Sequence, residues 1–131
     1  MSPIRFSSRK QLPLVMQSEA AECGLACLVM VASYHGYETD LPTLRRRFSV
    51  SAQGMTLAQL MQFATRLDLL GRPLRVELPA LDQLALPAIL HWDFNHFVVL
   101  VKASGKMLTL HDPARGRIEI NRGEASRHFT G

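Results

Sequence analysis

The chain has 131 residues, of which 47% are hydrophobic and 20% charged, and its formal net charge at pH 7 is +4. This length suits a single domain with its own hydrophobic core, and the hydrophobic fraction excludes a disordered chain. The longest strongly apolar run, Cys23–Tyr34, has only 12 residues, whereas a membrane-spanning helix needs about 20.

Three helices are predicted in the first half of the chain. The run Cys23–Tyr34 is apolar nearly all round, so it should form a buried helix that stops at Gly36. Asp40 can cap a short helix entered through Pro42, because its side chain accepts from unpaired backbone amides. A third helix is expected over Thr56–Leu67, where apolar residues recur at spacings of three and four and form one face. These residues are Leu57, Leu60, Met61, Ala64 and Leu67.

Short apolar or β-branched segments follow Gly71, separated by Pro, Gly and Asp, and they predict strands. The segment FVVLV is apolar on both faces, which is typical of a central strand. Residues 121–129 are expected to close the chain as a short helix. Helices followed by a mostly antiparallel sheet make an α+β domain. The expected strands are Leu74–Glu77, Ala88–His91, Phe97–Val101, Met107–His111 and Arg117–Ile120.

Residues 1–11 are expected to form a polar N-terminal arm, and residues 12–131 a single domain. The apolar stretch near the N-terminus is too short for a secretory signal, so both cysteines are expected to be free thiols facing the reducing cytosol. Residues 41–76 carry six arginines and one aspartate. They lack the recognition motif or stacking aromatics of a nucleic-acid site, so no nucleic-acid partner is predicted. An acidic lipid or protein surface stays open as a partner for them.

Cys23 lies where a polar loop, QSEAAE, meets the predicted buried helix. A thiol at a helix N-terminus feels the positive end of the helix dipole, which stabilises the thiolate. Cys23 is therefore a candidate nucleophile, with a small buried hydrophobe as the alternative. Cys27, one turn further inside the apolar run, is expected to be such a buried residue.

His96 begins the FVVLV strand, and Asp112 ends the next predicted strand, MLTLHD. If residues 103–105 form a three-residue hairpin loop, residues whose numbers sum to 208 pair across the two strands. His96 and Asp112 then lie directly opposite one another on one face, where the carboxylate can fix the tautomer of the imidazole. The alternatives are an exposed histidine with a turn aspartate, or a register slipped by one residue that places Phe97 opposite Asp112.

The same residue types also allow a zinc site. Cys23 and Cys27 are four residues apart, His91 and His96 are five apart, and four Cys/His ligands suit zinc. Common zinc knuckles place their cysteine pairs around a turn, however, and not within an apolar helix. No metal ion or other cofactor is therefore predicted, and a zinc-stabilised interaction domain is kept as an alternative.

Two separated motifs resemble those of one protein family. QSEAAECGLACLVMVASYHGYETDL resembles the cysteine motif of the bacteriocin-processing peptidase domains of peptidase-containing ABC transporters, and HFVVLV followed by LHDPARG resembles their histidine and aspartate motif. LRRRFSVSAQGMTLAQL and PAILHWDF are similar to the colicin V exporter branch. The resemblance extends from about Leu12 to Gly131. It implies a papain-like cysteine peptidase fold, with N-terminal helices packed on a mostly antiparallel sheet.

The resemblance also implies a role for each of four residues. Cys23 matches the family's nucleophile, His96 its general base and Asp112 the group that orients this histidine. Gln17 matches the side chain of the oxyanion hole, where its amide can donate to the developing charge together with the Cys23 backbone N–H. None of the four departs from the family pattern. The alternative is a catalytically silent domain that only binds the leader or cargo of a toxin exporter.

The substrates implied by the resemblance are precursor peptides whose leader ends in Gly-Gly or a similarly small pair, cut directly after it. The implied partners are the transmembrane and ATP-binding domains of an ABC transporter, at the cytoplasmic face of the bacterial inner membrane. Trp92, Asp93 and Phe94 lie just before the histidine and are candidates to wall a narrow substrate cleft, although Trp92 can equally fill the core. The apolar face of the helix 56–67 either packs into the core, which is favoured, or receives an amphipathic leader helix.

Overall fold

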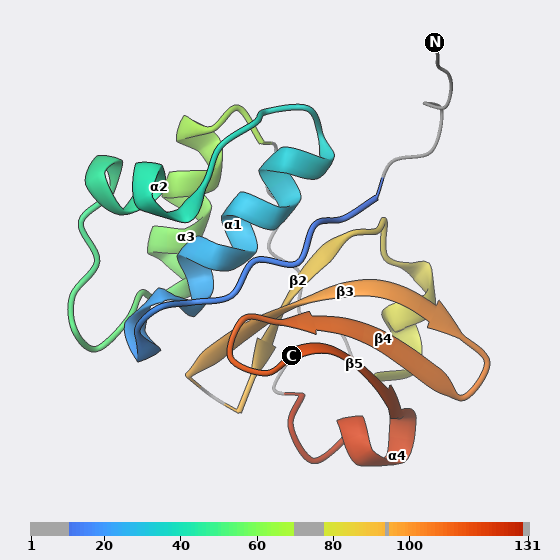
Figure 1. Cartoon of the computed structure of the whole chain (residues 1–131). Coiled ribbons are helices and arrows are strands. Elements are labelled where there is room, and N and C mark those ends of the chain that lie inside the picture. Colours follow the sequence, from blue (N-terminus) through green and yellow to red (C-terminus); the bar gives the residue numbers. More distant parts are fainter. Residues whose placement is uncertain (1–10, 70–77, 94, 130–131) are drawn as a thin grey trace, which may run out of the picture.

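The computed structural model describes residues 11–69, 78–93 and 95–129. Three helices lie on one face of a four-stranded antiparallel sheet, which confirms the predicted α+β architecture (Figure 1). The helices are α1 (Cys23–Tyr34), α2 (Leu41–Arg47) and α3 (Leu57–Arg66). The strands, in both chain order and sheet order, are β2 (Ala88–Trp92), β3 (His96–Ser104), β4 (Met107–Asp112) and β5 (Gly116–Asn121). The short helices are η1 (Ala20–Glu22), η2 (Leu78–Gln83) and α4 (Arg122–Ala125).

Helix α1 has the bounds that its apolar run predicts, and its residues 23–30 are all buried. It is covered all round because it packs against α2 and α3 as well as against β3. Asp40 caps α2 as predicted, since its Oδ1 accepts from the Thr43 N–H at 2.8 Å. Thr56 and Gln59 form a capping box at the start of α3.

The apolar face predicted for α3 is rotated slightly in the structure. Leu60, Ala64 and Leu67 are buried as expected, and Phe63 joins them by stacking on Phe48. Leu57, the first residue of α3, is by contrast 51% exposed. Core packing is therefore confirmed for most of this face and is wrong for Leu57.

Both faces of the sheet are covered. Phe97 and Val99 pack against α1–α3, whereas Val98 and Leu100 pack into a second core with η2 and α4. Alternate residues of β3 thus enter two different cores, and β3 has a strand on each side. This confirms FVVLV as a central strand buried on both faces.

The β3–β4 hairpin differs from the prediction in its turn. Ser104 pairs with Met107, so the turn holds two residues and not three, and its first residue, Gly105, has φ +58°. Two-residue turns that begin with a left-handed glycine match the twist of the flanking strands. The additional residue lies within β3 instead, as a bulge between Leu100 and Lys102.

The bulge sets the register at the far end of the hairpin. Beyond it, Val99 pairs with His111, and continuing this register places Val98 opposite Asp112. The predicted direct pairing of His96 with Asp112 is therefore wrong. His96 lies two residues before Val98 in β3. It is therefore diagonal to Asp112 on the same face, and long side chains can bridge this separation.

The ends of the second half also differ from expectation. The strand predicted over Leu74–Glu77 lies outside the described residues. The helix predicted over 121–129 forms only as the four residues of α4, and Phe129 instead forms an antiparallel bridge with Trp92. Within residues 11–69, 78–93 and 95–129, no helix has the length and apolar character needed to cross a membrane.

Arg45 and Arg47, in the basic segment 41–76, both have partners within the chain. Arg45 pairs with Glu22. Arg47 donates to the Tyr37 hydroxyl oxygen at 2.8 Å and to the Arg66 carbonyl at 2.9 Å. These contacts tie α2 to η1, to the loop that follows α1 and to the end of α3, so part of this positive charge stabilises the helical layer.

Candidate active site

His96 and Asp112 meet at the end of the sheet where β3 begins and β4 ends. His96 Nε2 lies 2.7 Å from Asp112 Oδ1, and this oxygen also accepts from the Ala114 N–H at 2.8 Å. The Asp112 side chain is only 3% exposed. The carboxylate therefore fixes the orientation of the imidazole ring and leaves Nδ1 as the ring nitrogen available to another partner.

That partner is Cys23, whose thiol interacts with the imidazole of His96 and contributes to the raised pKa of the ring. Cys23 is the first residue of α1 and is 5% exposed. At this position the N–H groups of the first turn lack helical partners, and the helix dipole favours negative charge. The fold thus brings a thiol, an imidazole and a carboxylate together, with a hydrogen bond of 2.7 Å between the last two.

The electrostatics of this chain of contacts favour a charged imidazole. The hydrogen bonds to Asp112 and then to Cys23 raise the pKa of His96 from 6.5 to about 9, against the effect of burial. Burial alone would raise the pKa of Asp112, but the hydrogen bonds from His96 and the Ala114 N–H lower it below its ordinary value. At neutral pH the site therefore holds an imidazolium beside a carboxylate, and this imidazolium can stabilise a Cys23 thiolate.

Gln17 is held beside these residues by its backbone. Its N–H donates to the Pro113 carbonyl at 2.9 Å, one residue after Asp112. Its side-chain Oε1 is buried and has no hydrogen-bond partner among the described residues. This oxygen is an acceptor, so donation to an oxyanion would come from Nε2 of the same amide.

The segment before Gln17 is fastened to the sheet by His111. The Nδ1–H of His111 donates to the Pro13 carbonyl at 3.1 Å, and its Nε2 accepts from Arg117 at 3.1 Å. The bond from Arg117 requires an unprotonated Nε2, and burial together with the Arg117 charge lowers the pKa of His111, although the bond to Pro13 opposes this shift. Residues 13–17 thus run along the end of β4 and carry Gln17 to the catalytic end of the sheet.

Two further residues act on the loop that precedes Cys23. Glu22 is buried, and both of its oxygens accept hydrogen bonds from Arg45. Neither residue is among those that the sequence predicts to be functional. The spacing of Glu19 and Glu22 is that of a capping box and is a local signal for Glu22, whereas the contact with Arg45 depends on how α2 packs.

The four residues weighed as a zinc site do not converge as a set of ligands. No group of three or more His, Cys, Asp or Glu residues within the described ranges is arranged to hold a metal ion. His91 contacts the Phe97 ring, with centroids 5.4 Å apart. Cys27 is completely buried in the helical core.

Trp92 and Asp93, two of the residues predicted to wall a substrate cleft, differ in burial. Trp92 is 2% exposed, packs in the second core and stacks on the His128 ring with centroids 5.4 Å apart. Asp93 has φ +51°, and its Oδ1 lies 2.8 Å from His128 Nδ1. Phe94 lies outside the described residues. This packing favours the alternative in which Trp92 fills the core, and it shows Asp93 and His128 bracing the turn that leads to His96.

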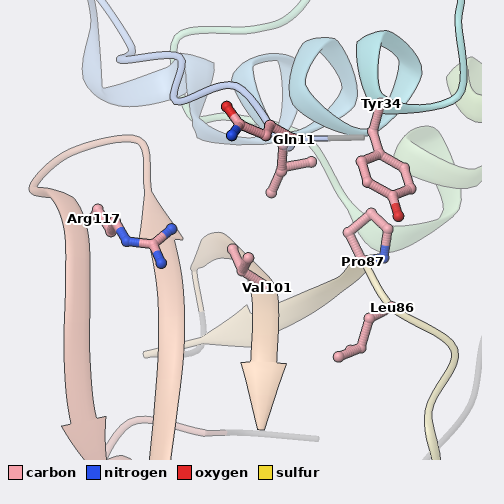
Figure 2. Close-up of a pocket in the computed structure, with 7 residues that line it drawn as sticks. Gln11, Tyr34, Leu86, Pro87, Val101 and Arg117 are labelled. Carbon is pink, nitrogen blue, oxygen red and sulfur yellow. The ribbon is translucent and has the colours of Figure 1, made fainter. Parts of the chain in front are cut away.

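A cavity of about 470 Å³ lies elsewhere, at the C-terminal end of α1 (Figure 2). Tyr34, Pro87, Val101 and Arg117 are among its lining residues, and Figure 2 shows Tyr34 and Arg117 on opposite sides of it. Its lining includes none of the four candidate catalytic residues. The catalytic contacts are therefore made outside this cavity.

The two cysteines should differ strongly in reactivity. Iodoacetamide at neutral pH should alkylate Cys23 at least about tenfold faster than Cys27, because thiolate character and access control the rate. Burial raises the pKa of the Cys27 thiol well above its ordinary value. Peptide mapping by mass spectrometry measures both rates, and the unfolded protein, in which both thiols should react alike, is the control. Equal labelling in the folded protein would contradict the assignment of Cys23.

Comparison with known proteins gives a consistent result. Residues 11–131 match the family model described as Peptidase C39 family. The colicin V secretion/processing ATP-binding protein CvaB and the probable microcin-H47 secretion/processing ATP-binding protein MchF, both of Escherichia coli, are each 50% identical to this chain over 123 residues. The match covers 94% of this chain and 18% of each relative. The chain therefore spans less than a fifth of the length of these relatives.

A solved structure agrees in fold and sequence. It is the crystal structure of a double glycine motif protease from an AMS/PCAT transporter, in complex with the leader peptide. The two chains superpose with a TM-score of 0.86 and are 37% identical, and the match covers 96% of this chain and 91% of that chain. This likeness confirms the papain-like fold that the sequence motifs imply.

Proposed function

Because this chain belongs to the peptidase C39 family, a family of cysteine peptidases, we propose that Cys23 is its nucleophile and His96 its general base. Asp112 orients this base and stabilises its charged form, and Gln17 donates to the oxyanion. One observation above all supports the assignment: the bond between His96 Nε2 and Asp112 Oδ1, at 2.7 Å, leaves the other ring nitrogen for the thiol at the start of α1.

The reaction follows from these contacts. The Cys23 thiolate attacks the carbonyl carbon of the scissile peptide bond, while the Gln17 amide and the Cys23 N–H donate to the oxygen that becomes negative. His96 then gives its proton to the departing amine as the C–N bond breaks, which leaves a thioester on the sulfur. A water molecule, deprotonated by His96, attacks the thioester, and the C–S bond breaks to release the acid and restore the thiolate–imidazolium pair.

The proposed substrates are precursor peptides whose leader ends in two glycines or a similarly small pair. Support comes from the solved neighbour, a double glycine motif protease that binds a leader peptide, and from relatives named for secretion and processing of colicin V and microcin H47. In the whole protein, residues 12–131 would act as one peptidase domain. This domain would be joined to transmembrane and ATP-binding parts and would work at the cytoplasmic face of the bacterial inner membrane.

Incubation with a synthetic leader peptide ending in Gly-Gly and a short cargo segment tests this proposal. Mass spectrometry should show a single cut after the second glycine. Replacing that glycine by alanine should lower kcat/KM partly, and replacement by leucine should lower it by about two orders of magnitude, because a small displacement of the reacting carbonyl costs large factors in rate. Efficient cleavage after leucine would contradict the proposed specificity.

The same assay separates the proposal from its main alternative. A silent docking domain would bind the labelled leader without forming product, whereas a peptidase should do both. A tetrapeptide that ends in Gly-Gly is the matched control substrate. It should be cleaved poorly, because two glycines offer almost no apolar surface for binding and the rest of the leader must supply the affinity.

A further inference from the structure

A buried carboxylate lies directly before the candidate nucleophile. Glu22 ends η1, is 5% exposed, and is followed at once by Cys23. Its Oε1 accepts from the backbone N–H groups of Ser18 at 3.1 Å and Glu19 at 3.2 Å. These bonds fold the loop that follows Gln17 back onto the residue before the nucleophile, so one side chain determines the shape of the loop.

Arg45, on α2, holds the same carboxylate from the other side. Its Nη2 donates to Glu22 Oε1 at 3.1 Å, and its Nε donates to Oε2. This two-pronged arrangement fixes orientation as well as distance, which a lysine cannot reproduce. The hydrogen bonds from Arg45 hold the pKa of Glu22 below its ordinary value despite burial. The carboxylate is therefore charged and fully partnered, as a buried charge must be.

The other end of the loop is fixed independently. The Gln17 N–H donates to the Pro113 carbonyl at 2.9 Å, next to Asp112. A loop tied at both ends restricts the position of Gln17 relative to the backbone N–H of Cys23, and the side chain of the first and the N–H of the second are the two groups proposed to donate to the oxyanion. We propose that Glu22, clamped by Arg45, is a positioning residue for the oxyanion hole. This inference rests on the roles proposed above for Cys23 and Gln17.

A positioning role and a purely electrostatic role of Glu22 predict opposite effects on turnover when its charge is removed. Glu22 adjoins Cys23 in the chain, and neutralising it would leave the Arg45 guanidinium without its counter-charge, a change that favours a nearby thiolate. If Glu22 acted only through its charge, its neutralisation would leave turnover unchanged or raise it. If Glu22 holds the loop, turnover should fall although the thiolate forms more readily.

The test compares Glu22→Gln, Glu22→Ala and Arg45→Lys with the wild type on the Gly-Gly leader peptide. Glu22→Gln should lower kcat by about tenfold to a hundredfold, because a displaced oxyanion donor loses most of its effect, and KM should change by less than about twofold. Glu22→Ala should lose more, because glutamine still accepts from the Ser18 and Glu19 amides. Alkylation of Cys23 by iodoacetamide, followed against pH, should be unchanged or shifted to lower pH.

A matched control is Arg122→Lys, in another arginine–carboxylate pair at the opposite end of the hairpin, where Arg122 donates to Asp82 and to the Gly105 carbonyl. It should leave kcat unchanged. A wild-type protein that does not cut the leader would refute the proposed function. An active wild type with an equal kcat in Glu22→Gln would refute only the positioning role, as would a shift of Cys23 alkylation to higher pH. If Glu22→Gln does not fold, Arg45→Lys, at a side chain 44% exposed, decides by the same kcat criterion.

Discussion

Replacing Cys23 with alanine should abolish cleavage of the Gly-Gly leader peptide, down to the uncatalysed background. Alanine has no sulfur to form the thioester. Without the nucleophile, the remaining catalytic residues accelerate the reaction very little, because they act as a unit. The substitution removes a single atom at a residue that begins α1, so the fold and the affinity for the leader should be retained. Product formation is measured by mass spectrometry, and leader binding by fluorescence anisotropy.

Cys27→Ala is the matched control for this substitution. Cys27 lies one turn further along the same helix and is completely buried in the helical core. Its replacement should keep kcat within about twofold of the wild type and lower the free energy of unfolding by about 1 kcal/mol, as expected for loss of a small buried group. Residual turnover of Cys23→Ala near the wild-type rate would show that another residue attacks the peptide bond.

The helical half of the fold could be predicted closely because its signals are local. An apolar run gives α1 its bounds, and an aspartate followed by proline fixes the start of α2. The face of α3 was harder to assign, because apolar residues alone do not show which of them point to the core. Stacking of Phe63 on Phe48 draws the buried stripe away from Leu57, and this contact depends on how α2 and α3 pack.

The sequence could predict that His96 and Asp112 lie on the same face of the sheet, although the predicted register of the hairpin was wrong. A three-residue turn and a two-residue turn with one bulge both add a single residue to the hairpin. Either arrangement therefore leaves His96 and Asp112 on the same face, since side chains alternate with a period of two. The sequence does not show that the turn lies at Gly105 and Lys106, with the additional residue within β3. The register beyond the bulge is therefore offset by two residues from the predicted one, and the direct pair becomes a diagonal one.

The contacts that complete the site join residues far apart in the chain. The Gln17 N–H meets the Pro113 carbonyl, and Glu22 meets Arg45. Pattern and propensity describe neighbours in sequence, so they cannot reveal such contacts. The role of Gln17 followed from the family motif. The only local signal for Glu22 is its capping-box spacing from Glu19, and its contact with Arg45 depends on where α2 packs.

Replacing His96 with alanine should lower kcat/KM by about two to four orders of magnitude, because it removes the group that both takes and returns the proton. Asp112→Asn should cost less, about tenfold to a hundredfold, because asparagine keeps a carbonyl to orient the ring and loses only the charge. The measurement is kcat/KM on the leader peptide, with circular dichroism to confirm that both variants fold. Glu119→Gln on the neighbouring strand β5 is a control that removes a carboxylate outside the catalytic contacts.

The pH dependence tests the same pair through its charge. With the pKa of His96 raised to about 9, the imidazolium and its activity should persist to about pH 9 in the wild type, and Asp112→Asn should move this limit to lower pH because it removes the largest cause of the shift. The stability that the raised pKa contributes is complete below about pH 6.5, declines above it and is lost above about pH 9. Thermal unfolding of the wild type and Asp112→Asn should therefore differ most in mildly acidic solution, below about pH 6.5, and converge in alkali. A folded Asp112→Asn as inactive as His96→Ala would show instead that the carboxylate itself is indispensable to proton transfer.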